Sequence, residues 1–150
     1  DPKTGGFCIY RVRETPLPRT PDHIPYLPGI KSLYDGLARR MSRGDAKGSL
    51  EEALKLHEKV PGVDNISNLV AQGYAGIGRW EKAYKYYRPA FEHGTIGAEN
   101  LWGMAEAAAN LGRWKEARRL YARAMEIYPF KRGEGEKRLA QLRRVSASRR

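Results

Sequence analysis

The chain has 150 residues, enough for one domain that buries roughly two-thirds of the surface its unfolded form exposes. Hydrophobic residues make up 41% of it and charged residues 30%, which predicts a soluble globular protein. No apolar run reaches the roughly 18 residues of a membrane span, and the single Cys8 excludes an internal disulfide. The formal net charge is +11, and residues 131–150 contribute more than half of it. Such a basic tail is either a solvated terminus or a contact for RNA phosphate, an anionic lipid surface or an acidic protein.

Residues 1–29 are predicted to form an extended arm, because six of them are proline and none follows a helical period. An arm of this length cannot bury its own side chains. The alternatives are packing on the helical body, packing on a partner, or exposure to solvent, and they apply to Phe7, Tyr10, Ile24, Tyr26 and Leu27. The chain begins at Asp1 rather than Met, so we expect any targeting segment to lie upstream.

A repeat of 34 residues occupies the middle of the chain. The stretch GRWEKAYKYYRPA begins at Gly78, and GRWKEARRLYARA begins at Gly112. Tryptophan, alanine, tyrosine and alanine recur in both at spacings of three, four and three, which places them on one face of a helix. A second amphipathic segment precedes each glycine, so each unit is predicted to be helix, glycine turn, helix. The predicted fold class is all-α, a solenoid of αα-hairpins.

A third and weaker copy lies nearer the N-terminus. GSLEEALKLHEKV is predicted to open its second helix, with Gly48 as the turn, thirty residues before Gly78. Ser49 and Glu52 then form a predicted capping box at the start of that helix. The repeats are assigned to residues 30–130, in units of about 30–63, 64–97 and 98–130.

Residues 131–150 are predicted to form a basic capping helix and tail, because they carry eight Lys or Arg and two Glu. GEGEKR is predicted to be a flexible linker, after which Leu139 and Leu142 cover the last hairpin. An end helix with a polar outer face keeps a stack of repeats soluble. Three arginines are candidate contacts for RNA backbone, anionic lipid or acidic protein: Arg138, Arg143 and Arg144.

These units resemble the tetratricopeptide repeat, a 34-residue helix–turn–helix with small interface residues and a closing proline, here Pro129. The second unit, with NLVAQGYAGIGRWEKA followed by EHG, is also similar to the pentatricopeptide repeat. The first resemblance implies a protein-binding scaffold, and the second implies binding of single-stranded RNA. In architecture and size the chain further resembles the small pentatricopeptide-like accessory subunits of euglenozoan ATP synthase.

The tetratricopeptide resemblance implies that the first helices line a concave groove. Six side chains are candidate groove contacts: Asn68, Gln72, Glu99, Trp102, Glu106 and Asn110. The carboxylates among them disfavour a clamp for a peptide's terminal carboxylate and favour a basic or aromatic segment. The alternative for Trp102 is a place in the core between first helices. Base-specific RNA binding is disfavoured, because only Asn68 among the three implied base-contacting positions suits that role.

Two arginines follow the turn glycines. Neither packing nor the repeat pattern requires Arg79 and Arg113, which are therefore candidate rim contacts for an acidic partner. No metal site is predicted, because His23, His57 and His93 lack other ligands at a metal-binding spacing. No cofactor or small-molecule substrate is expected either, and the sequence predicts no enzyme.

We therefore expect a non-catalytic scaffold for protein–protein interaction. Arm and tail together make up about a third of the chain, which favours a structural subunit whose partners are other proteins of a larger assembly. The basic charge, the missing Met and the mixture of two repeat types favour a mitochondrial assembly, either a ribosome, a respiratory complex or ATP synthase. The alternative function is that of a single-stranded RNA-binding protein.

Overall fold

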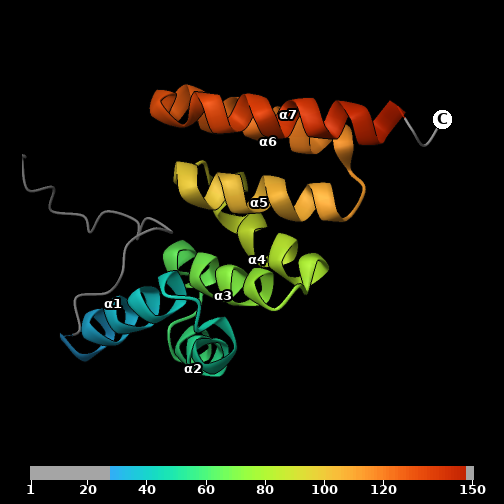
Figure 1. Ribbon diagram of the computed structural model, residues 1–150. Helices are drawn as coiled ribbons and strands as arrows, with labels where there is room; N and C mark the ends of the chain where they lie inside the picture. Colours follow the sequence, from blue (N-terminus) through green and yellow to red (C-terminus); the bar gives the residue numbers. More distant parts are fainter. Residues whose placement is uncertain (1–27, 148–150) are drawn as a thin grey trace, which may run out of the picture.

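The computed structural model describes the backbone of residues 28–147 and the side chains of residues 29–145. This part of the chain is all-α (Figure 1). Its elements follow in the order α1 Pro28–Ser42, α2 Ala46–Lys59, α3 Asp64–Gly76, α4 Trp80–His93, α5 Ala98–Asn110, α6 Trp114–Ile127, the 3₁₀ turn η1 Pro129–Lys131 and α7 Arg132–Ala147. The predicted arm lies outside the described residues up to residue 27, and its extended form stays a prediction.

Consecutive helices pack in pairs, α1 with α2, α3 with α4 and α5 with α6, and α7 packs on α6. The pairs stack in chain order, so α1 and α2 lie at one end of the molecule and α7 at the other (Figure 1). Contacts of α2 with α3 and of α4 with α5 join each pair to the next. Within the described residues, the predicted solenoid of αα-hairpins is confirmed.

All three pairs share one register, which corrects the predicted first unit. Its turn glycine is Gly44, with φ +92°, and not Gly48. Gly78 (φ +74°) and Gly112 (φ +76°) are the equivalent turns, since glycine takes positive φ without a Cβ clash. Helix α2 begins at Ala46, two residues after its turn glycine, as α4 and α6 also do. The spacing from the first turn glycine to Gly78 is therefore the full 34 residues and not the predicted thirty.

The predicted capping box at Ser49 is wrong. Asp45 is the N-cap of α2, and its side chain accepts a hydrogen bond from the backbone N–H of Gly48 at 3.1 Å. An aspartate in this position satisfies a donor that the helix start leaves unpaired. Ser49 lies inside the helix and is fully buried, and Glu52 pairs with Arg40 of α1, with 2.7 Å between Oε1 and Nη1.

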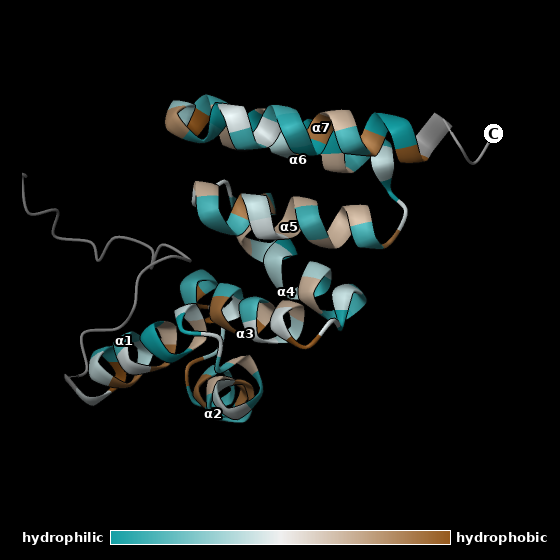
Figure 2. Ribbon diagram, in the orientation of Figure 1, coloured by the Kyte–Doolittle hydropathy of each residue, from teal (hydrophilic) through white to brown (hydrophobic). Residues whose placement is uncertain are grey.

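Alanines and tyrosines of the second helices form tight contacts in the core. Ala83 and Ala117 are fully buried, as the repeat pattern predicts for residues where two helices touch. Tyr87 and Tyr121 are also buried, and the Tyr87 hydroxyl lies against Gly103 of α5. Figure 2 shows brown hydrophobic positions interspersed with teal ones along the helices, the pattern of amphipathic elements. The core thus continues from one repeat into the next.

A buried carboxylate links the two ends of the second hairpin. Asp64, the first residue of α3, is 2% exposed. It accepts a hydrogen bond from the Thr95 hydroxyl, and its Oδ2 lies 3.0 Å from Nδ1 of His93, the last residue of α4. Partners of this kind are needed because desolvating an unpaired carboxylate is costly. The contact therefore holds the beginning of α3 against the end of α4.

Helix α7 begins at Arg132, so the flexible linker predicted at GEGEKR is wrong. Gly135 lies within the helix and is buried against α6, where a Cβ would collide with Sδ of Met125. Glycine here allows a close approach of two helices rather than flexibility. Leu142 is buried in the core and Leu139 packs beside it, as predicted for a helix that covers the last hairpin.

Candidate functional site

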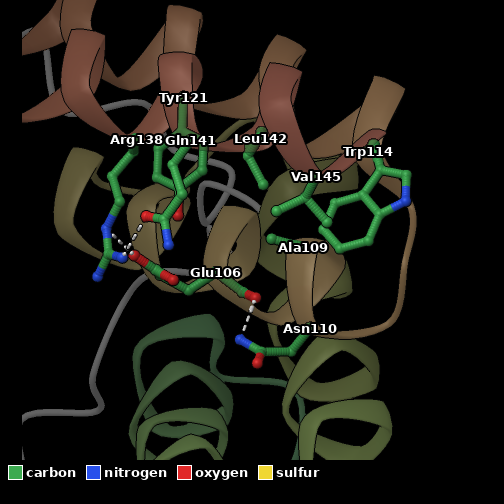
Figure 3. Close-up of a pocket in the computed structure, with 9 residues that line it drawn as sticks. All are labelled: Glu106, Ala109, Asn110, Trp114, Tyr121, Arg138, Gln141, Leu142 and Val145. Carbon is green, nitrogen blue, oxygen red and sulfur yellow. Dashed lines mark hydrogen bonds and ion pairs between the residues drawn. The ribbon is translucent and has the colours of Figure 1, made fainter. Parts of the chain in front are cut away.

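A hollow of about 330 Å³ lies between α5 and α7 (Figure 3). Helices α5, α6 and α7 contribute its lining: Glu106, Ala109, Asn110, Trp114, Tyr121, Arg138, Gln141, Leu142 and Val145. Figure 3 shows a polar end around Glu106 and an apolar end around Trp114. The sequence-based candidates include Glu106, Asn110 and Arg138, and they miss the remaining side chains.

An ion pair between α5 and α7 holds the polar end. Nε of Arg138 lies 3.1 Å from Oε1 of Glu106, whose side chain is 25% exposed. The Tyr121 hydroxyl hydrogen-bonds to the same carboxylate, and burial together with this contact raises the pKa of Tyr121. Nη1 of Arg138 also donates to Oε1 of Gln141 at 3.3 Å. Glu106 therefore anchors α7 on the last hairpin while part of its carboxylate stays accessible.

The apolar end is lined by Ala109 of α5, Trp114 of α6, and Leu142 and Val145 of α7. Trp114 is the first residue of α6, and in Figure 3 its indole lies beside Val145. A small residue at 109 leaves space between the helices that a larger side chain would fill. The hollow can therefore accept an apolar group at one end and a cationic or hydrogen-bonding group at the other.

The two groove candidates on α3 are engaged by the fold itself. Asn68 is 1% exposed, and neither polar atom of its amide has a hydrogen-bond partner among the described residues. Its side chain is interior, which departs from the expected place on the groove surface. Gln72 is half-buried, and its Nε2 donates to Oδ1 of Asn100 at 2.8 Å, which links the first helices α3 and α5.

The candidates on α5 differ in exposure. Glu99 and Asn110 are exposed, and the Asn110 amide donates to the backbone carbonyl of Glu106 at 2.9 Å. Trp102 is half-buried: its ring packs edge-on against Tyr121 with 4.9 Å between centroids, and Lys131 Nζ lies 5.6 Å from its centroid. Trp102 thus combines the two alternatives, because it packs against the core and is still partly exposed. Ligand contacts by these residues stay predictions.

The rim candidate Arg113 joins two repeats. Its guanidinium lies 4.6 Å from the centroid of the Tyr84 ring and 3.3 Å from the Glu81 carboxylate, both on α4. The Tyr84 hydroxyl in turn donates to Glu116 of α6. Burial and this hydrogen bond raise the pKa of Tyr84 to about 12. The junction of α4 and α6 therefore gives Arg113 a packing role that the sequence alone did not suggest.

Arg79 occupies the same place in the preceding turn, but among the described residues it has no equivalent ring or carboxylate partner. The 34-residue register puts Leu50 and Lys47 of α2 where Arg113 finds a ring and a carboxylate. Neither residue can bind a guanidinium in that way. The Arg79 side chain is exposed, so its contact with an acidic partner stays a prediction.

The three tail candidates also differ. Arg138 pairs with Glu106 in the hollow, whereas Arg143 and Arg144 are exposed on α7. Contacts of these arginines with a partner stay predictions. Residues 148–150, with two more arginines, lie outside the described part of the chain.

Charge is divided between the first and second helices of the last two repeats. Helices α3 and α5 contain no Lys or Arg, and their charged residues are Asp64, Glu99 and Glu106. Helices α4 and α6 contain seven cationic residues: Lys82, Lys85, Arg88, Lys115, Arg118, Arg119 and Arg123. A basic tail at residues 131–150 is predicted from the sequence, but this second basic surface was not. Its signal was the recurrence of cations within both GRW segments.

The comparison with protein families agrees with this geometry. Residues 98–131 match the family model described as tetratricopeptide repeat. The chain is a tetratricopeptide-like helical repeat protein. The match covers α5, α6 and η1, and the same helix–turn–helix spacing recurs in the two preceding pairs. A comparison with curated proteins finds no match, and neither comparison supports the resemblance to ATP synthase subunits.

Tetratricopeptide-like repeats generally mediate contacts between proteins and typically act as scaffolds without catalysis. The described residues contain no cluster of three or more side chains that could hold a metal ion. No helix in the described range is long and apolar enough to cross a membrane. An interaction role is thus the general function of this fold, and the hollow between α5 and α7 is a candidate site for it.

Proposed function

We propose that this tetratricopeptide-like protein is a scaffold that holds a segment of a partner protein in the hollow between α5 and α7. The observation that carries this proposal is the two-ended lining, with Trp114 and Val145 at one end and the Glu106 carboxylate at the other. Glu99 lies two turns before Glu106 on the same face of α5, and it is exposed. Because Arg138 already pairs with Glu106, the exposed Glu99 is the carboxylate that would attract a cation. This arrangement fits an apolar or aromatic side chain that is followed by Lys or Arg.

We further propose that the protein is a structural subunit of a larger assembly, in the mitochondrion. The support is the share of the chain outside the three repeats and the net charge of +11. Single-stranded RNA binding, the alternative function, has weaker support, because Asn68, the one suitable base-contacting residue, is 1% exposed.

The test places a photo-reactive amino acid at Gln141, an exposed residue that lines the hollow, in the tagged full chain expressed in its native cells. The matched control carries the same group at Ser32, which is exposed on α1 at the other end of the molecule and does not line the hollow. We expect a discrete protein adduct from position 141 that survives a high-salt wash, and none from position 32. The same adducts from both positions, or adducts with RNA alone, would contradict the proposal.

The chemistry of the ligand is tested in the same cells by reversing one charge. Glu99→Lys removes an exposed carboxylate two turns before Glu106 on α5, and Glu126→Lys makes the same change at an exposed position of α6. We expect the adduct from position 141 to weaken several-fold with Glu99→Lys only, because a basic ligand would be repelled. Co-sedimentation of the tagged chain with a large complex at high salt tests the role as a subunit, and a free monomer would contradict it.

A further inference from the structure

The outer face of helices α4 and α6 carries two hollows that the interaction site between α5 and α7 does not use. These helices are partly hidden behind α5 and α7 in the view of Figure 1. The first hollow, of about 320 Å³, is lined by Glu81, Lys82, Tyr84, Lys85, Arg88 and Arg113. The second, of about 210 Å³, is lined by Phe91, Glu116, Arg119, Leu120 and Arg123. The hydrogen bond from Tyr84 to Glu116 joins the two linings.

We propose that this outer face is a second docking surface, which binds an acidic segment of a partner protein. The two hollows are lined by six cationic side chains and two carboxylates, so the surface has an excess of positive charge. Phe91 and Leu120 add an apolar floor to the second hollow. A segment with several Asp or Glu and an intervening apolar residue is complementary to both features.

Two of the cations are available to a ligand without breaking any contact of the fold. Arg88 is paired with Glu92 at 2.6 Å, and Arg113 is held by Glu81 and the Tyr84 ring. By contrast, the exposed side chains of Lys85 and Arg119 have no hydrogen-bond, ion-pair or ring partner in the described part of the chain. One lies in each hollow, so a single bound segment could contact both.

The ring contacts favour an acidic protein over single-stranded nucleic acid. Proteins that bind single strands stack bases on exposed aromatic faces. Here the Tyr84 ring lies under the guanidinium of Arg113, and the Phe91 ring lies 5.6 Å from the guanidinium carbon of Arg123. Glu116 also places a carboxylate between the cations, where it would repel a continuous line of phosphates. A peptide can place an uncharged residue opposite Glu116 and its acidic residues opposite the cations on either side. A nucleic acid cannot do so, because every nucleotide carries a phosphate.

The surface is separate from the hollow between α5 and α7, since no residue lines both. The cations lie mainly on α4 and α6, whereas Glu99 and Glu106 lie on α5. A chain with both sites can therefore bridge two partner segments of opposite charge. This goes beyond the proposed function, which requires only one ligand on one face.

The experiment measures binding of a short fluorescein-labelled peptide of alternating glutamate and leucine by anisotropy at near-physiological salt. The protein is the full chain, and the test variant is Lys85→Glu with Arg119→Glu. The matched control is Lys47→Glu with Lys59→Glu, which makes the same change of charge at two exposed positions of α2. Circular dichroism confirms that both variants keep their helices, and labelled oligouridine is titrated in parallel.

We expect the test variant to weaken peptide binding by about tenfold or more and the control to change it less than about twofold. Equal losses in both variants would show that only the net charge attracts the peptide, and they would overturn the proposal. It is also overturned if the parent chain does not bind the peptide, or if it binds oligouridine more tightly. Because photo-crosslinking from Gln141 reports on the other face, its failure would leave this result unaffected, and the reverse also holds.

Discussion

Replacing Gly103 by alanine tests whether α4 and α5 approach each other as closely as the structure shows. In an open helix interior, alanine is more stable than glycine by about 0.5–1 kcal/mol. The site of Gly103 is not open, because an added Cβ would lie 2.5 Å from the hydroxyl oxygen and 2.9 Å from Cζ of Tyr87. Tyr87 is 2% exposed, so its ring has little space into which it can move. Overpacking of this kind costs about 1–3 kcal/mol, so Gly103→Ala should lower the free energy of unfolding by roughly 0–2.5 kcal/mol.

Gly36 of α1 provides the matched control, because nothing lies within 4 Å of its added Cβ. We expect Gly36→Ala to raise the free energy of unfolding by about 0.5–1 kcal/mol. Urea unfolding followed by circular dichroism measures the free energy of unfolding of both variants. In thermal unfolding, each kcal/mol of change should shift Tm by about 2–4 °C. Adding Tyr87→Phe to Gly103→Ala should recover part of the loss, since it removes the nearest atom. Equal stabilisation by both alanines would refute the close approach of α4 and α5.

Two other predictions concern polar groups. Burial and Glu116 raise the pKa of Tyr84 from 10.0 to about 12, so the folded state favours the protonated hydroxyl. The resulting contribution to the free energy of unfolding is fully present below about pH 10 and is lost as the pH rises through about 12. Glu116→Gln should lower that pKa. An absorbance titration of phenolate measures it, with Tyr84→Phe as the reference that identifies the Tyr84 signal. No change in the pKa with Glu116→Gln would show that the hydrogen bond is absent. Asn68→Leu removes a buried amide without partners among the described residues and should raise the free energy of unfolding by about 1–2 kcal/mol. Denaturant unfolding that shows a loss instead would mean that the amide is hydrogen-bonded.

The last two repeats could be predicted from the sequence because their chemistry is local. A turn glycine and small residues at helical spacing mark the same packing positions in both GRW segments. The predicted turn of the first repeat is wrong by four residues, because a second glycine, Gly48, lies one helical turn after the true turn at Gly44. A shift of four residues is about one helical turn, so the same residues remain on nearly the same face of the helix. The apolar pattern therefore fits both registers. The positive φ of Gly44 and the N-cap at Asp45 distinguish the turn from the helix.

The glycines of α7 misled the sequence analysis for a different reason. Composition alone cannot distinguish a glycine that gives flexibility from one that allows two helices to touch. Gly135 is of the second kind, because its position against Met125 is defined only once α7 has packed on α6. The hollow between α5 and α7 depends on the same docking, which brings Arg138 to Glu106 across more than thirty residues. Sequence periodicity contains no information about such a contact.

Arg79 and Arg113 show how far a repeated residue can be interpreted. Both follow a turn glycine at the same place in the register, and both directly precede a helix that begins with tryptophan. Their surroundings differ because the preceding repeat differs: Tyr84 and Glu81 hold Arg113, whereas the first repeat has no aromatic ring or carboxylate at the equivalent positions. A repeated side chain thus has a structural role only where the neighbouring repeat supplies a partner. In this chain that condition holds at the junction of α4 and α6, whereas Arg79 is exposed and its contact with an acidic partner stays a prediction.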